Sequence, residues 1–273
     1  MTLIRRDSGA DPDPLYEEAQ DDPRRPLTRL TMTPEEIQAR LLYRDGLMLV
    51  LDKPAGLAVH AGPGGGDNLE RYFDALRFGL PRPPALAHRL DRDTSGCLVL
   101  GRHPKALRKL GKMFSEGRIG KTYWAVVVGG PAEDAGTMDA ALVKRSDAKR
   151  GWRMIVAPDG QAAVTDWRVL GRGDGLTWLE MHPRTGRTHQ IRVHCAHMGC
   201  PVLGDPVYGG QRAGDRAVSL HLHSRAVRIP IYTTKPAVDV SAPVPPHMLA
   251  ALTACGWTGE APTQVEAACD DPG

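Results

Sequence analysis

The sequence lacks the features that mark secreted, membrane and zinc-binding proteins. Its 273 residues include five cysteines, which show no CxxC spacing. An odd number of cysteines without that spacing argues against a disulfide framework and against a structural zinc site. No apolar run is long enough to span a membrane, and the N-terminus lacks the apolar segment of a signal peptide. These absences predict a soluble cytoplasmic protein that does not bind membranes.

The sequence also lacks a large excess of charge of either sign. Its formal net charge is +3, which says little about its partners. The basic residues are unevenly spread, however, and gather at residues 102–112, at 144–153, which is expected to be a loop, and at 184–192. Such patches are typical of surfaces that meet a nucleic-acid backbone, although a single patch is more often a solvated surface.

Composition divides the chain into three parts. Residues 1–30 are rich in Asp, Pro and Arg and have no hydrophobic periodicity, which predicts a mobile N-terminal arm. Residues 259–273 are expected to form a disordered C-terminal tail. Residues 31–258 contain no internal repeat or low-complexity tract and are predicted to form one folded domain.

Hydrophobic patterns predict an α+β fold. Short apolar runs or alternating residues indicate strands at 47–51, 97–100, 123–128, 164–170, 176–181 and 220–223. A helix capped by Thr188 is expected to direct Ile191, Cys195 and Met198 inward and to stop at Gly199. The order of these elements favours a mixed, largely antiparallel sheet with helices and loops at its sides.

A second helix is predicted between Pro104 and Gly117. Its apolar residues Leu107, Leu110 and Phe114 recur at spacings of three and four, so they are expected to face the core. The opposite face then holds four basic residues, Lys105, Arg108, Lys109 and Lys112. That face is a candidate RNA-binding surface.

The densest polar segment covers residues 88–96, with the sequence HRLDRDTSG. The simpler interpretation is a surface turn, in which Asp93 and Ser95 bond to the local backbone. The alternative is a carboxylate in a pocket rimmed by cations, where an arginine keeps it ionised and oriented. An ionised aspartate can act as a nucleophile at a sugar or at an electron-poor ring.

This segment resembles the HRLDxxTSG motif of the RluA-type RNA pseudouridine synthases, and every fixed letter is present. Residues 121–125, KTYWA, resemble the KxYxA motif of that family, and residues 185–194, TGRTHQIRVH, resemble its third motif. Residues 199–209, GCPVLGDPVYG, are similar to the segment that follows it. Residues 52–57 and 220–223 also match in type and position, so the resemblance covers roughly residues 41–230.

The resemblance implies a fold, a reaction and three catalytic residues. The implied fold is α+β, with a mixed, largely antiparallel sheet and a central active-site cleft formed by residues 31–258. The implied enzyme is an isomerase that breaks the bond from ribose to the uracil nitrogen, turns the base and rejoins it through carbon. Asp91 matches the catalytic aspartate, Tyr123 the active-site tyrosine and Arg192 the arginine that pairs with the aspartate. Because no redox change occurs, no cofactor is expected.

The resemblance also suggests residues that contact the substrate. Arg89 is expected to fill the space that the target uridine leaves, and Arg187 is a second choice for the arginine beside Asp91. His88 and Lys121 are further candidates for RNA contact. Many family members have a small RNA-binding domain in front, for which residues 1–40 are too short and too polar. We therefore expect the catalytic domain, as a monomer, to hold tRNA or ribosomal RNA itself.

Two alternatives stay open at this point. A non-catalytic RNA-binding protein could use the same fold, although the presence of Asp91 argues against it. A metal hydrolase could use the many histidines, which are His182, His189, His194, His197, His221 and His223. Because the sequence shows neither an HExxH pattern nor CxxC, we expect no metal site.

Overall fold

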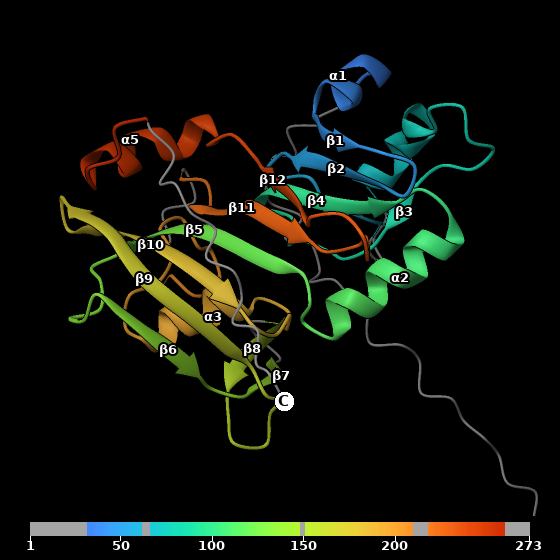
Figure 1. Ribbon diagram of the computed structural model, residues 1–273. Helices are drawn as coiled ribbons and strands as arrows, with labels where there is room; N and C mark the ends of the chain where they lie inside the picture. The colour runs from blue at the N-terminus through green and yellow to red at the C-terminus, as the bar shows by residue number, and fades with distance from the viewer. Residues whose placement is uncertain (1–31, 62–65, 148–150, 210–217, 260–273) are drawn as a thin grey trace, which may run out of the picture.

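The computed structural model describes residues 32–61, 66–147, 151–209 and 218–259 (Figure 1). The predicted N-terminal arm and almost all of the predicted tail lie outside the described residues. The boundaries 31 and 258 for a single domain therefore remain a prediction. Within the described residues, no helix is both long enough and apolar enough to cross a membrane.

A ten-stranded sheet forms the framework, in the order β1-β2-β4-β11-β5-β10-β9-β6, with β12 beside β11 and β3 beside β4. Among these described strands, β4 and β11 pair in parallel and the other pairs are antiparallel. The prediction of a mixed, largely antiparallel sheet is confirmed. The strands are β1 (Leu41–Arg44), β2 (Met48–Lys53), β3 (Ala85–Leu86), β4 (Ser95–Gly101), β5 (Gly120–Val128), β6 (Ala135–Asp139), β9 (Val164–Gly173), β10 (Leu176–Pro183), β11 (Leu222–Ile229) and β12 (Val238–Ser241).

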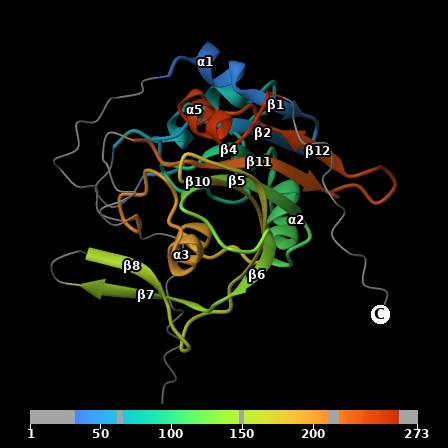
Figure 2. The same cartoon turned by 90° about the vertical axis from the view of Figure 1, so that its left-hand side faces the viewer.

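Both faces of this sheet are buried, because alternate residues of its strands enter different clusters. On β2 and β4, Leu49 and Leu98 join a cluster that includes Ile191 and Cys195 of α3 (Gln190–His197). The same cluster receives η2 (Leu69–Leu76), a 3₁₀ helix, and α1 (Pro34–Ala39). The opposite face is covered by α2 (Pro104–Ser115) and α5 (Pro246–Ala254). Figure 2 shows α3 and α2 on different sides of the sheet.

Helix α2 follows the prediction closely. His103 caps it by accepting the N–H of Ala106 at 3.2 Å, and Pro104 occupies the first turn, where its missing N–H costs nothing. Its four basic residues are exposed as expected. The buried positions are Ala106, Leu110 and Met113, so the inward face is rotated from the predicted one. Phe114 is only half-buried, at the edge of the contact.

The basic segment 144–153 was predicted to be a loop, and that prediction is wrong. Strands β7 (Leu142–Asp147) and β8 (Gly151–Val156) form a separate two-stranded sheet. Residues 148–150 between them, which include Lys149 and Arg150, lie outside the described residues. The hairpin packs beside α3, because Leu142 and Val193 share a small apolar cluster with half-buried Met154. Its strands are hard to predict because apolar and charged residues do not alternate regularly in them.

Candidate active site

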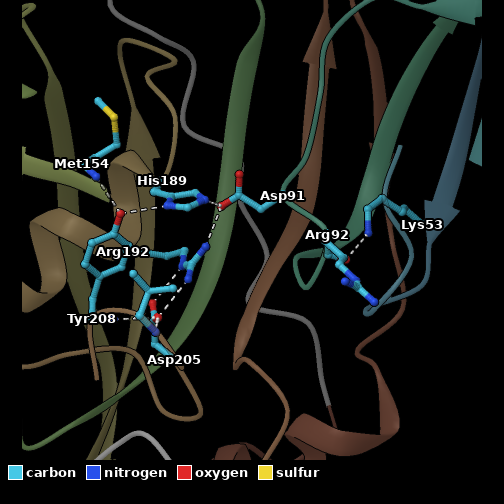
Figure 3. A network of polar contacts seen from close by, with 9 residues as sticks. Lys53, Asp91, Arg92, Met154, His189, Arg192, Asp205 and Tyr208 are labelled. Atoms are coloured by element: carbon cyan, nitrogen blue, oxygen red, sulfur yellow. Dashed lines mark hydrogen bonds and ion pairs between the residues drawn. The ribbon is translucent and has the colours of Figure 1, made fainter. Parts of the chain in front are cut away.

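Asp91 lies in the loop between β3 and β4, and neighbouring groups fix this loop. The side chain of Leu90 is buried in the core, and Lys53 at the end of β2 is fully buried. The Lys53 ammonium donates to the carbonyl oxygen of Arg92 at 2.7 Å and to that of Pro54 at 2.8 Å (Figure 3). The N–H of Gly56, a residue with φ of +85°, also donates to the Arg92 carbonyl, at 3.0 Å. The chain on both sides of Asp91 is therefore held by the core and by a buried cation.

Arg192 pairs with Asp91, as the sequence resemblance implied. Its Nη1 lies 3.3 Å from Asp91 Oδ2, and its side chain is only 5% exposed. The rest of the guanidinium is held by Asp205, with Nε to Oδ2 at 2.8 Å and Nη2 to Oδ1 at 2.9 Å. Asp205 also accepts the N–H groups of Val207 and Tyr208. One arginine thus connects a buried carboxylate to the partly exposed carboxylate of Asp91.

The turn before α3 brings a further side chain to Asp91. Thr188 was expected to cap this helix, but the residue at the N-cap is His189, whose φ of +53° is in the left-handed region. Buried Gln190 holds the turn by accepting the N–H of Arg187 and donating to the carbonyl of Val164. This geometry places His189 Nε2 3.9 Å from Asp91 Oδ2.

His189 is enclosed by aromatic residues. Its Nδ1 lies 2.8 Å from the hydroxyl of Tyr208, and that hydroxyl accepts the N–H of Met154 at 3.1 Å. The ring of Trp152 stacks on the imidazole, with centroids 5.4 Å apart and planes 22° apart. The sequence did not single out His189 as a neighbour of Asp91, and it did not indicate Asp205, Tyr208 or Trp152 either. The DPVY part of residues 199–209 was the signal that could have identified two of them.

The electrostatic environment favours the carboxylate form of Asp91. Burial acts to raise its pKa, but His189, Arg192 and Arg89 together outweigh burial, so the pKa lies below its ordinary value. Because the pKa of Arg192 is raised by its two aspartates despite burial, the guanidinium stays charged. The side chain of Asp91 is 21% exposed. The site therefore offers an ionised, partly accessible carboxylate.

Tyr123 on β5 belongs to the cluster that packs against α3, and its side chain is almost completely buried. Burial raises the pKa of its phenol strongly, and the nearby charge of Asp91 raises it further, against a hydrogen bond with Ser224. The phenol is therefore neutral at physiological pH. It can stack on a base or donate a hydrogen bond without carrying charge.

The predicted substrate-binding residues occupy different environments. Arg187 donates Nε to the carbonyl of Ala162 at 3.0 Å, so Arg192, and not Arg187, is the arginine at Asp91. Lys121 donates to the carbonyl of Thr185 at 3.2 Å, and burial lowers its pKa to about 8. Both side chains are therefore held by backbone carbonyl groups, Arg187 by that of Ala162 before β9 and Lys121 by that of Thr185 in the turn before α3.

His88 does not fit the expected role in RNA contact. Its Nε2 accepts the N–H of Val99 at 3.0 Å, and its ring stacks on Phe114 with centroids 4.3 Å apart. Burial lowers its pKa to about 3, so the ring is neutral. These contacts connect the Asp91 loop to β4 and α2, which is a structural role.

Comparison with known proteins identifies the family. The model of the family described as RNA pseudouridylate synthase matches residues 47–197, which is more than half of the chain. The chain belongs to the RNA pseudouridine synthase family. An uncharacterised RNA pseudouridine synthase of Zymomonas mobilis is 43% identical over 208 residues, covering 76% of this chain and 94% of the relative. Ribosomal large subunit pseudouridine synthase C of Vibrio cholerae is 32% identical, covering 89% of this chain and 77% of its own length.

A solved structure supports the same assignment. Human RNA pseudouridylate synthase domain containing 4 matches this pseudouridine synthase with a TM-score of 0.69 and 26% identity. The match covers 81% of this chain and 95% of the human chain. The relatives confirm the RluA-type resemblance, the pseudouridine synthase fold and the assignment as an RNA-modifying isomerase.

The histidines do not form a metal site within the described residues, where no group of three or more His, Cys, Asp or Glu side chains could hold an ion. His194 instead contacts Thr165 Oγ1 and the carbonyl of Ala140 at 2.9 and 3.1 Å. His182 lies 3.1 Å from Glu180. The described part of this pseudouridine synthase thus offers no ligand set for the metal-hydrolase alternative.

The buried pair of Asp205 and Arg192 generates a first prediction. Asp205→Asn removes one partner of a buried ion pair and should lower the free energy of unfolding by about 3–5 kcal/mol. Asp166→Asn, which breaks the exposed pair with Arg184, should cost less than about 1 kcal/mol. Urea unfolding of the three proteins measures both effects. Equal losses in the two variants would contradict the central role of Asp205.

The same experiment has a pH dependence with a defined sign. Burial acts to raise the pKa of Asp205, but Arg192 and the two backbone N–H groups outweigh it, so the folded-state pKa is depressed. A depressed carboxyl pKa stabilises the fold above the ordinary value and loses that effect as pH falls through the folded value. The difference between parent and Asp205→Asn should therefore shrink in acid.

Proposed function

We propose that this enzyme converts specific uridines of ribosomal RNA or tRNA to pseudouridine, with Asp91 as the catalytic carboxylate. The observation that supports this role is the contact between Asp91 and Arg192, which combines an ionised, partly exposed carboxylate with a buried cation. We further propose that the chain works as a monomer in the cytoplasm. The named function of the Vibrio cholerae relative favours ribosomal RNA as the first substrate to test.

In the proposed reaction, Asp91 acts where positive charge develops on the ribose. Cleavage of the bond from ribose C1′ to uracil N1 leaves the base with the bonding electrons. An ionised carboxylate can then add to C1′ or stabilise the sugar cation, as in glycoside hydrolysis. The base turns, C5 bonds to the sugar, the hydrogen of C5 leaves as a proton and N1 takes one up, so product and substrate have the same atoms. Arg192 keeps the free carboxylate of Asp91 ionised at the start of this sequence.

We propose that Tyr123 acts on the base as a neutral phenol. A neutral phenol can take up the C5 proton only while it passes its own proton on to a base. The base we propose is the carboxylate of Asp91, whose charge already acts on this phenol and which is free again once the new bond to the sugar has formed. The hydroxyl would therefore pass the proton to Asp91, which releases it to water, while the ring stacks on uracil.

The proposed RNA path runs over one end of the sheet. The turn before α3 presents exposed Arg184 and Arg187. Gly117, just after α2, lies close to the carbonyl of Arg184, so the C-terminal end of α2 adjoins that turn. Arg89, beside Asp91, is proposed to fill the space of the flipped uridine, which must leave its stack to reach the carboxylate. The exposed residues of the β7–β8 hairpin, Lys144 and Arg145, extend the path beside the site.

Asp91→Asn tests the catalytic assignment. The amide preserves size but removes charge and nucleophilicity, so turnover should fall by at least about 1,000-fold, or roughly 4 kcal/mol of transition-state stabilisation. Transcripts of ribosomal RNA and tRNA labelled with tritium at uridine C5 release tritium into water as product forms. The assay is run in excess chelator. A variant that retains a tenth of the parent turnover would remove Asp91 from the mechanism.

Tyr123→Phe tests the proton transfer through the phenol. The phenyl ring still stacks but has no hydroxyl, so single-turnover product formation should slow by at least about tenfold while the RNA dissociation constant changes by less than about threefold. Equal rates for the parent and the variant would leave stacking as the whole role of Tyr123.

Charge reversal on α2 tests the RNA path. The double variant Lys109→Glu/Lys112→Glu should raise the apparent KM and reduce the salt slope of RNA binding by about 2, because each lost phosphate contact contributes about 1. The rate on saturating RNA should stay the same. The control Arg71→Glu/Arg172→Glu changes the net charge equally at exposed positions on η2 and β9. If both double variants weaken binding alike, only total charge matters and α2 is not part of the path.

A further inference from the structure

The imidazole of His189 is held on three sides, by Asp91, Tyr208 and Trp152. Its side chain is 12% exposed. Its Nδ1 faces the Tyr208 hydroxyl at 2.8 Å, and its Nε2 faces Asp91 Oδ2 at 3.9 Å. A φ of +53° is uncommon for any residue other than glycine, although histidine adopts it more often than most. Backbone strain beside a reactive group indicates that the position of the His189 side chain matters for function.

The hydrogen bonds around Tyr208 determine which nitrogen of His189 has the proton. The Tyr208 hydroxyl accepts the N–H of Met154, so its own single proton is available for His189 Nδ1. Nδ1 is then the acceptor, and the proton of the neutral imidazole sits on Nε2. The opposite tautomer would leave the phenol proton without an acceptor and would direct the Nε2 lone pair at a carboxylate. The Tyr208 hydroxyl at Nδ1 and the Asp91 carboxylate at Nε2 therefore both favour the tautomer with its proton on Nε2.

We propose that His189 is a positioning residue, which presents Nε2–H to Asp91 Oδ2 and thereby leaves Oδ1 as the oxygen that acts on the sugar. Arg192 acts on the same Oδ2, at 3.3 Å. Figure 3 shows the second carboxylate oxygen directed away from both groups. The proposal rests on the catalytic role of Asp91. The distance of 3.9 Å exceeds a hydrogen bond, and catalytic hydrogen bonds often tighten only when substrate binds.

The charged surroundings of His189 are mixed. Asp91 and Asp205 act to raise its pKa, Arg192 and Arg89 act to lower it, and burial has the largest effect, so the pKa is lowered. Trp152 separates the ring from Lys144, whose ammonium lies 4.9 Å from the Trp152 ring. The imidazole is therefore neutral at pH 7, and Nε2–H is its one donor.

The β7–β8 hairpin supplies two of the contacts that fix this ring. Trp152 stacks on it, and Met154 gives the N–H that orients the Tyr208 hydroxyl. The hairpin is a separate sheet with exposed basic residues. RNA bound along it would therefore lie next to Trp152, which stacks on His189. The hairpin is thus part of the catalytic geometry as well as of the proposed RNA path.

Tyr208→Phe is the most specific test, because it leaves the His189 ring in place and removes the hydroxyl that selects its tautomer. The Met154 N–H loses the same acceptor, and thermal unfolding measures that cost separately. The proton can then move to Nδ1, and turnover at pH 8 should fall by about 10- to 100-fold, the usual effect of one lost hydrogen bond to a charged group. As pH falls toward the pKa of His189, the protonated ring regains Nε2–H. The deficit relative to the parent should therefore shrink in acid.

Two substitutions of His189 complete the test. His189→Phe keeps a ring against Trp152 but has no N–H, and it should lower kcat by about 10- to 100-fold with KM changed less than about threefold, without the recovery in acid. His189→Gln places an amide N–H near the position of Nε2 and should recover part of the loss. His197→Gln, exposed on the same helix, is the control. Tritium release from labelled ribosomal RNA is the measurement, with thermal unfolding to confirm that each variant folds.

The outcomes separate this proposal from the proposed function. If Asp91→Asn is inactive while Tyr208→Phe and His189→Phe keep the parental kcat, His189 has no positioning role and only this proposal is overturned. If Tyr208→Phe loses activity equally at every pH, the tautomer argument is wrong. An active Asp91→Asn variant would instead overturn the catalytic assignment itself.

Discussion

The structure depends on a chain of alternating charges, from buried Asp205 through Arg192 to Asp91. Taking an ion pair out of water is costly, and the cost is repaid only when every lone pair and proton finds a partner. Here Asp205 accepts two hydrogen bonds from Arg192 and two more from backbone N–H groups. The remaining nitrogen of the guanidinium is left for Asp91. The buried pair of Asp205 and Arg192 therefore fixes the position of the guanidinium nitrogen that contacts Asp91.

Three distant segments have to meet for this chain to exist. The loop with Asp91 is fixed by buried Lys53 and Leu90, α3 supplies Arg192, and the segment after α3 supplies Asp205. All three reach one face of the sheet, where the largest apolar cluster also packs α3 against β5. The opposite face holds α2 and α5 and has no part in the contacts to Asp91 described above. One face of the sheet thus holds the residues around Asp91, and the other face is covered by helices that stabilise the sheet.

The fold class could be predicted from local hydrophobic patterns, and the acid–arginine pair from the resemblance of two motifs to those of the family. The strand at 97–100 is extended to Ser95–Gly101, and the helix from Pro104 ends at Ser115, so both lie within a few residues of the prediction. The Asp205 pairing could not be predicted in this way, since it joins residues 13 positions apart across a helix end. The role of His189 depends on a positive φ, which is too rare at any residue other than glycine to be predicted from the sequence. The β7–β8 hairpin was missed because contacts with α3, more than its own residue pattern, stabilise it.

The left-handed conformation at position 189 brings a cost and a gain in stability to the same residue. Glycine and asparagine adopt positive φ with least strain, and relief of that strain is worth about 1 kcal/mol. Neither residue has a ring to fill the space between Trp152 and Asp91, and the cavity left by a buried ring costs more than that, typically about 2–5 kcal/mol. Selection for heat resistance and selection for activity should therefore retain the same side chain here, so stabilising substitutions in this enzyme are expected away from position 189.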